Sequence, residues 1–354
     1  MNPPLACLVV GTRPQLIKAG QLQSAHIRRG SAFNLYVIDT GQHYDEALAS
    51  ASSTGLTDRT ALHLQHDEVG RVTIDKMIDG IWRTLSASSP SHVATIGDTN
   101  TTLAATLAAT DLGIGVTHIE AGLRSGDRAM PEERNRLVAD HLSDHLLAPS
   151  QTAVENLKRE NLGARTVHTG DLSLDRMLEI VNDSSFVPKD RWGSPSVFMT
   201  VHRVSNLSGE RFSWILEVIN FLAERSRIVL PAHPRLVAQL ESRTKGISNL
   251  SLVAPLSHSE TLSHLASSDL VVTDSGGIQR EAFWLARKCV TLRDETEWIE
   301  TLSDERNTLI APVSWQRQLE RCLENSRLPP APNVYGDGSA ADRILEQLER
   351  NVAP

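Results

Sequence analysis

Three acidic residues in the first half of the chain stand where an isolated acid is unexpected. Asp98 follows the apolar run HVATI and lies among small polar residues in GDTNTT, Glu120 directly follows VTHI, and Glu132 belongs to MPEE. The carboxyl ends of parallel strands meet at one edge of a sheet, so these side chains are expected to converge. Carboxylates held together exchange protons near neutral pH, and the set predicts general acid–base chemistry. The simpler interpretation of Glu132 alone is an acid that stabilises a helix start.

Two glycine turns that precede helices are suited to anions. In VVGTRPQLIK (9–18), Arg13 is expected at a helix N-terminus, where free N–H groups attract negative charge. In VTDSGGIQREA (272–282), the turn Ser275, Gly276 and Gly277 lets the backbone approach a phosphate closely. This second stretch is neither a Walker loop nor a G-x-G-x-x-G motif, so it does not favour ATP or NAD as the ligand.

Two histidines and one further acid follow strands in the second half of the chain. His202 lies in TVHRVSN and His233 in PAHPR, each near an arginine. A single histidine is more often structural, but two at equivalent strand ends favour a binding or catalytic role. Glu297, in LRDETEW, follows another strand and has a carboxylate suited to ribose hydroxyls.

Short apolar runs alternate with helical patterns along the chain. The strands and helices that they predict must position the residues described above. The expected strands are 5–10, 34–39, 92–96, 115–119, 145–148, 166–169, 197–201, 227–231, 250–254, 270–273 and 289–292. Expected helices include 14–29, 151–160 and 340–351, and SHSE (257–260) is a capping box. This order predicts an α/β fold of two doubly wound, Rossmann-like halves, with residues 181–196 as a linker. The cleft between the halves is the expected site.

Composition narrows the class of protein. The 354 residues suffice for two domains, and the net charge of −8, from 35 basic and 43 acidic residues, argues against nucleic acid or a membrane as partner. No apolar run approaches the 18 residues typical of a membrane-spanning helix. The N-terminal stretch lacks the positively charged region with which a signal peptide begins. The three cysteines are scattered and fit no metal spacing, so we expect a cytoplasmic protein without a metal site.

Eight motifs between residues 9 and 344 occur in a characteristic order: GTRPQLIK, TGQHYDE, GDTNTT, HIEAGLRS, MPEERNR, TDSGGIQREA, LRDETEW and YGDGSAADRI. Together they resemble the motif series of the bacterial, non-hydrolysing UDP-N-acetylglucosamine 2-epimerases. The resemblance implies a GT-B fold, with an N-terminal Rossmann-like domain (1–176) joined by a C-terminal helix (339–354) and a UDP-binding domain (177–338). It also implies a homodimer that binds a UDP-sugar in the cleft and needs no cofactor.

The implied reaction interconverts UDP-GlcNAc and UDP-ManNAc. UDP leaves C1, the C2 proton is lost to give 2-acetamidoglucal, and UDP adds back after a proton returns to the other face. Carried over motif by motif, the catalytic residues are Asp98, Glu120, Glu132, His202 and Lys18. The residues implied to bind UDP or substrate are Arg13, His233, Ser275, Gly276, Gly277 and Glu297.

Alternatives within and outside this class remain open at the level of sequence. The residues of the RPQ and LRDETEW motifs resemble those of the family branch that includes 2-epimerases of UDP-2,3-diacetamido-glucuronate. A hydrolysing epimerase, which releases ManNAc and UDP, would share the carboxylates. A UDP-sugar-binding regulator without turnover, or a GT-B glycosyltransferase, would have no need for this set of acids.

Overall fold

A computed structural model describes residues 3–42, 56, 59–62, 64, 72–189, 195–203, 206–232, 234–324 and 328–352. The chain divides into two compact units: unit 1 comprises residues 1–176 and 333–354, and unit 2 comprises residues 177–332. The expected linker, 181–196, starts where helix α7 (Leu172–Val181) ends and stops where strand β8 (Ser196–Thr200) begins, and its residues 190–194 lie outside the described part.

Unit 1 is built on a seven-stranded parallel sheet with the order β3-β2-β1-β4-β5-β6-β7. Its strands are β1 (Leu5–Val10), β2 (Asn34–Asp39), β3 (Arg59–Ala61), β4 (His92–Ile96), β5 (Gly115–Ile119), β6 (His145–Ala148) and β7 (Thr166–His168). The strand order reverses between β1 and β4, which lie side by side with Val9 opposite Thr95. Ligands of such sheets bind beside this reversal, so the turns after β1 and β4 are the natural site.

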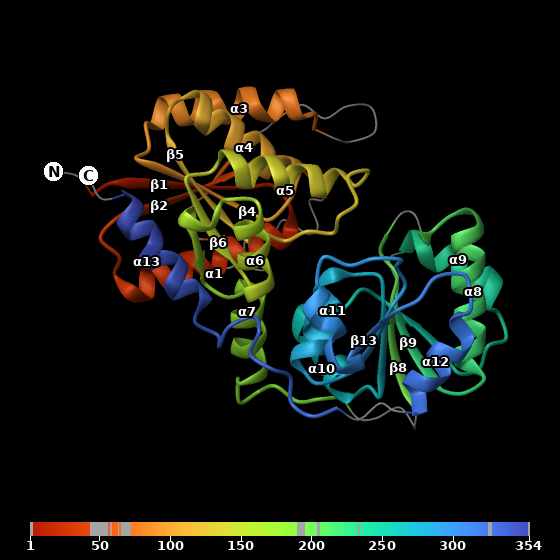
Figure 1. Ribbon diagram of the computed structural model, residues 1–354. Coiled ribbons are helices and arrows are strands. Elements are labelled where there is room, and N and C mark those ends of the chain that lie inside the picture. The colour runs from red at the N-terminus through yellow and green to blue at the C-terminus, as the bar shows by residue number, and fades with distance from the viewer. Residues whose placement is uncertain are drawn as a thin grey trace. The chain divides into compact units, whose positions relative to one another are not determined.

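Helices cover both faces of this sheet (Figure 1). They are α1 (Arg13–Arg29), α3 (Ile74–Ser88), α4 (Asn100–Asp111), α5 (Pro131–Leu142), α6 (Gln151–Arg159), α7 and α13 (Ala340–Val352). Alternate residues of β1 point to opposite faces: Ala6, Leu8 and Val10 join the core under α1 and α13, whereas Cys7 and Val9 join the core under α3 and α4. This two-sided burial explains why β1 is an unbroken apolar run.

The C-terminal segment packs back onto unit 1 from Asn333 onward, six residues before the expected helix segment. Tyr335 is buried and its carbonyl accepts a hydrogen bond from the Asp171 N–H at 2.9 Å. Asp175 accepts a hydrogen bond from the Ala341 N–H at 2.8 Å, at the start of α13. These contacts begin before the helix, which is why the structural unit includes the preceding loop.

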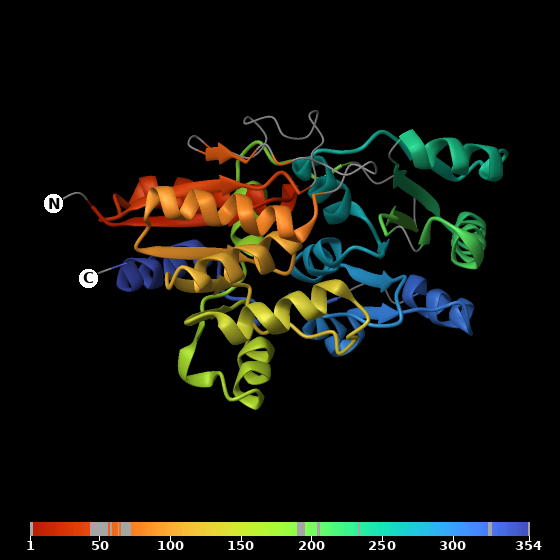
Figure 2. The ribbon, with the colours of Figure 1, turned by 90° about the horizontal axis from the view of Figure 1, so that it is seen from above.

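Unit 2 repeats the architecture with a six-stranded parallel sheet in the order β10-β9-β8-β11-β12-β13 (Figure 2). Its other strands are β9 (Arg227–Pro231), β10 (Leu250–Val253), β11 (Leu270–Thr273), β12 (Lys288–Thr291) and β13 (Asn307–Leu309). Its helices are α8 (Gly209–Ala223), α9 (Pro234–Thr244), α10 (His258–Ser267), α11 (Gly276–Trp284) and α12 (Trp315–Glu324), with the 3-10 segment η3 (Ile299–Glu305). Here the strand order reverses between β8 and β11.

The predicted α/β class with two parallel, doubly wound sheets is confirmed, and each expected strand is present to within one residue at each end. The capping box at α10 is also confirmed, with the side chains and N–H groups of Ser257 and Glu260 bonded reciprocally. Strands β3 and β13, each of three residues at the edge of its sheet, were not expected.

Candidate active site

Hydrogen bonds to one buried side-chain amide, that of Gln15, connect the turns that follow β1 and β4. Its Oε1 accepts hydrogen bonds from the N–H groups of Gly11 (3.0 Å) and Thr12 (3.2 Å). Its Nε2 donates to the Ile96 carbonyl at 2.7 Å and to the Thr99 hydroxyl at 2.9 Å. The GTRP turn and the GDTNTT turn therefore form one rigid surface. Sequence reasoning missed Gln15, although the T-x-x-Q spacing of a capping box would have identified it.

Close approach of the chain explains the glycine in the first turn. A Cβ at Gly11 would lie 2.1 Å from the Oγ1 of Thr40 and 2.2 Å from the Oγ1 of Thr101. Helix α1 begins at Arg13, one residue earlier than expected, and Arg13 is exposed in its first turn. Arg13 is therefore placed where the helix N-terminus and its own guanidinium can act on the same anion.

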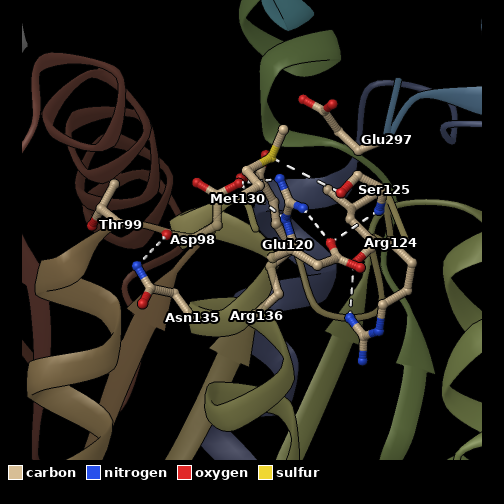
Figure 3. A network of polar contacts seen from close by, with 12 residues as sticks. Asp98, Thr99, Glu120, Arg124, Ser125, Met130, Asn135, Arg136 and Glu297 are labelled. Carbon is tan, nitrogen blue, oxygen red and sulfur yellow. Dashed lines mark hydrogen bonds and ion pairs between the residues drawn. The ribbon is translucent and has the colours of Figure 1, made fainter. Parts of the chain in front are cut away.

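Asp98 is held by two residues of helix α5. Arg136, whose side chain is only 3% exposed, donates from Nε (3.0 Å) and Nη2 (2.6 Å) to Oδ2 of Asp98. Asn135 donates to the Asp98 carbonyl at 3.0 Å, and Figure 3 shows both side chains reaching the same turn. Charge-assisted bonds of this kind hold the carboxylate in one orientation. Both Arg136 bonds fall on Oδ2, which leaves Oδ1 for a ligand.

Glu120 and Lys18 form a close ion pair although they are 102 residues apart in sequence. The Lys18 Nζ lies 2.6 Å from each carboxylate oxygen of Glu120. Glu120 has φ +67°, a left-handed conformation that is costly for a residue with a side chain and is usual only where the surroundings enforce it. A Cβ at Gly97 would lie 3.2 Å from Oε2 of Glu120, so this carboxylate lies against the residue that precedes Asp98. Asp98 and Glu120, two of the three acids expected to converge, therefore lie at neighbouring turns of unit 1, and Lys18 pairs with Glu120.

The two glutamates of MPEE have opposite environments. Glu132 is exposed in the first turn of α5. Glu133 is 2% exposed and accepts hydrogen bonds from the N–H groups of Ser125 (2.9 Å) and Gly126 (3.0 Å) and from Arg136 Nη1 (2.7 Å). Burial opposes ionisation of Glu133, but these donors outweigh it and hold its pKa below its usual range. Glu133 therefore anchors the loop before α5, and Glu132 is the one that a ligand can reach.

In unit 2 the start of helix α11 and Glu297 form a second polar corner. A Cβ at Gly276 would lie 2.6 Å from the Nε1 of Trp298 and 3.0 Å from Oε1 of Glu297, so only glycine fits there. Arg293, which is buried, donates to Glu297 at 2.8 Å. Ser275 is the N-cap of α11, whose free N–H groups and dipole suit a phosphate.

His202 is joined to this corner through Asp274, which sequence reasoning did not single out. Asp274 is fully buried and accepts hydrogen bonds from the N–H groups of His202 (2.9 Å) and Arg203 (2.9 Å) and from the Asn206 amide (2.9 Å). The His202 side chain itself is exposed. His233, the other histidine expected in the site, lies outside the described residues.

Within the described ranges, no group of three or more His, Cys, Asp or Glu side chains is arranged to hold a metal ion. No helix in the described part of the chain is long and apolar enough to cross a membrane. The cations near the candidate carboxylates are the protein's own lysine and arginines.

Two doubly wound parallel sheets with polar turns at their carboxyl ends define a GT-B protein. The chain belongs to the UDP-N-acetylglucosamine 2-epimerase family, whose model matches residues 25–349. It is 35% identical to a UDP-N-acetylglucosamine 2-epimerase homolog of Methanococcus maripaludis, over 97% of this chain and 99% of the relative. It is 32% identical to the UDP-2,3-diacetamido-2,3-dideoxy-D-glucuronate 2-epimerase of Pseudomonas aeruginosa, over 97% and 98%. Among solved structures, the Methanocaldococcus jannaschii UDP-GlcNAc 2-epimerase in complex with UDP-GlcNAc and UDP has a TM-score of 0.82 at 30% identity, with 98% of this chain and 99% of that chain covered.

Proposed function

We propose that this chain is a non-hydrolysing UDP-N-acetylglucosamine 2-epimerase that interconverts UDP-GlcNAc and UDP-ManNAc. The observation that carries the proposal is the pair of carboxylates, Asp98 and Glu120, at the ends of β4 and β5, each held by its own cation. A protein that only binds an anionic nucleotide gains nothing from two acids in its site. Proton transfer at a sugar carbon requires them.

The reaction begins with departure of UDP from C1, which gives that carbon oxocarbenium character and makes the C2 proton acidic. We infer that Oδ1 of Asp98, Glu120 and the exposed Glu132 exchange the C2 proton on the two faces of the sugar. Lys18 holds the Glu120 carboxylate in place. General acid–base steps of this kind contribute about 10²–10⁴-fold each.

The leaving UDP is stabilised by fixed donors in our proposal. The N–H groups at Ser275, Gly276 and Gly277 and the guanidinium of Arg13 bind the pyrophosphate, and Glu297 binds the ribose. His202 and His233 complete the substrate contacts. Such preorganised donors and cations stabilise developing negative charge without a metal ion.

Two related activities are alternatives to this proposal, and one of them has a similar relative behind it. The 32% identity to the Pseudomonas aeruginosa relative favours UDP-2,3-diacetamido-glucuronate as an alternative substrate of the same chemistry. A hydrolysing epimerase would use the same carboxylates and differ only in whether water reaches the glucal. The cluster of acids argues against a UDP-sugar-binding regulator.

The test is incubation with UDP-GlcNAc in deuterated water, followed by NMR of the anomeric protons. We expect UDP-ManNAc with deuterium at C2, because the proton leaves to a side chain and returns from solvent. Free ManNAc with UDP would establish the hydrolysing reaction. Turnover of UDP-2,3-diacetamido-glucuronate but not of UDP-GlcNAc would assign the chain to the 2-epimerases of that uronate. An active enzyme that keeps the original C2 hydrogen would contradict elimination.

The carboxylates are tested by Asp98→Asn and Glu120→Gln. Each variant keeps the size of the side chain, and we expect kcat to fall about 10²-fold or more while UDP still binds. Near-normal kcat in both variants would remove the assigned roles.

We further propose a homodimer in the cytoplasm. The three cysteines, Cys7, Cys289 and Cys322, are free and buried, as suits a reducing compartment. Light scattering on the purified protein measures the mass in solution, and a monomer at working concentration would contradict the dimer.

A further inference from the structure

A buried histidine lies beneath the two candidate carboxylates and is not used in the proposed chemistry. His118, on β5, is fully buried. Its Nδ1 lies 2.7 Å from Oδ1 of Asp140, and its Nε2 lies 2.7 Å from the carbonyl oxygen of Gly97. The Asp140 carboxyl group and the Gly97 carbonyl each present an oxygen to one ring nitrogen. The ring is therefore held between a side-chain carboxyl group and a main-chain carbonyl.

Asp140, on α5, fixes the orientation of this ring. It is fully buried, and its second oxygen accepts a hydrogen bond from the Gly122 N–H at 3.1 Å and lies 2.7 Å from Arg124 Nη1. Burial opposes ionisation of Asp140, but His118 and Arg124 beside it hold its pKa below its usual range. Arg124 also pairs with Glu160 at 2.7 Å, so Asp140 is itself held in place by a side chain with two carboxylate partners.

The atom that His118 holds belongs to the peptide that leads into Asp98. Gly97 has φ +69°, and its N–H donates to the Ile119 carbonyl at 2.9 Å. The turn is thus held at its N–H by β5 and at its carbonyl by the ring of His118. On the other side, His118 precedes Glu120 by two residues, so one ring lies beneath the backbone that carries both acids.

We propose that His118 and Asp140 form a positioning pair for Asp98 and Glu120, an inference that rests on the proposed epimerase function. Ion pairs in a protein interior are expensive, and well-packed apolar residues often replace them without loss of stability. The contact of His118 with the Gly97 carbonyl instead fixes the plane of the Gly97–Asp98 peptide. A displacement of about 1 Å of a reacting group can cost about 10²-fold in rate.

Two isosteric variants separate the two hydrogen bonds of His118. In His118→Asn the amide nitrogen replaces Nδ1 and can reach Asp140 but not Gly97. In His118→Gln it replaces Nε2 and can reach Gly97. We expect the Asn variant to lose about 10²-fold in kcat with KM nearly unchanged. The Gln variant should keep a kcat within about 10-fold of the parent, because the bond to the reacting turn is kept.

Stability and structure serve as readouts that do not depend on turnover. Both variants remove one buried bond, so we expect similar losses of Tm. Crystal structures should show a rotated Gly97–Asp98 peptide in the Asn variant only. An unchanged peptide in both variants, or equal kcat losses that follow Tm, would overturn the inference. Absence of epimerase activity in the parent protein would instead count against the proposed function and leave the peptide comparison valid.

If the His118→Asn chain does not fold, Asp140→Asn tests the other member of the pair. It keeps the size of the side chain and removes the carboxylate that holds Nδ1 of His118. A lower kcat at unchanged KM supports the inference, and a parental kcat overturns it.

Discussion

Changing Glu132 and Glu133 separately to Gln should have opposite consequences, although the two residues are adjacent. Glu133→Gln removes the charge beneath the loop before α5. An amide can accept from only one of the two N–H groups that now bond to the carboxylate, those of Ser125 and Gly126. Its NH₂ group would face donors, and Arg136 would lose one of its two carboxylate partners.

The cost can be worked from these contacts. A buried N–H left unsatisfied costs about 1–3 kcal/mol, and a lost hydrogen bond to a charged group costs about 1.5–3 kcal/mol. Together they lower the free energy of unfolding by roughly 4 kcal/mol. For a domain of about 200 residues, such as unit 1, each kcal/mol shifts Tm by about 2–4 °C, so we expect Tm to fall by roughly 10 °C.

Glu132→Gln is the matched variant. Glu132 is exposed, so Tm should barely change, whereas kcat should fall about 10²-fold if Glu132 transfers protons. Thermal unfolding followed by circular dichroism, with kcat measured well below Tm, gives both quantities for both variants. A stable Glu133→Gln protein with a large loss of kcat would reverse the two assignments and refute the reasoning.

The pH dependence of unfolding provides a control for the same variant. The pKa of Glu133 is lowered from its ordinary value of 4.5, so its contribution is present above about pH 4.5 and is lost as the pH falls through the folded pKa. The difference in stability between the parent and Glu133→Gln should therefore shrink below pH 4.5. A difference that is constant down to strongly acidic pH would show that packing, and not the carboxylate charge, is responsible.

Three other predictions test the surroundings of the site. Gln15→Glu places a carboxylate oxygen opposite the Ile96 carbonyl and the Thr99 hydroxyl, and should lower the free energy of unfolding in urea by about 2–4 kcal/mol, whereas an unchanged urea midpoint would contradict the role given to the amide. Burial lowers the pKa of His92 from 6.5 to about 4, so the unfolded chain binds the proton first and stability is lost as the pH falls below about 6.5. This loss should reach about 2 kcal/mol between pH 7 and pH 5 and should be smaller in His92→Gln, as urea titrations at the two pH values would measure. Gly276→Ala would place a methyl group against Trp298 and Glu297 and should weaken UDP binding by about 10-fold in calorimetry, so unchanged affinity would exclude this corner as the nucleotide site.

The sequence alone determined the order of elements and the turns that carry polar groups. Strands such as β1 and β4 are short apolar runs buried on both faces of a sheet, a pattern visible in one dimension. The acids Asp98 and Glu120 were recognisable because each lies within two residues of the end of such a run. The motif order also identified the family, which the comparisons confirmed. Local signals of this kind depend only on neighbours along the chain.

Only the tertiary structure decided which partners those residues have. Lys18 meets Glu120 across 102 residues and Gln15 meets Ile96 across 81, distances over which no local pattern specifies a contact. The difference between Glu132 and Glu133 also has a geometric origin, because successive residues of a helix point about 100° apart and only one of the two faces the buried loop. Long-range packing of two sheet-end turns against α5 therefore set which acid is an anchor and which is free for a ligand.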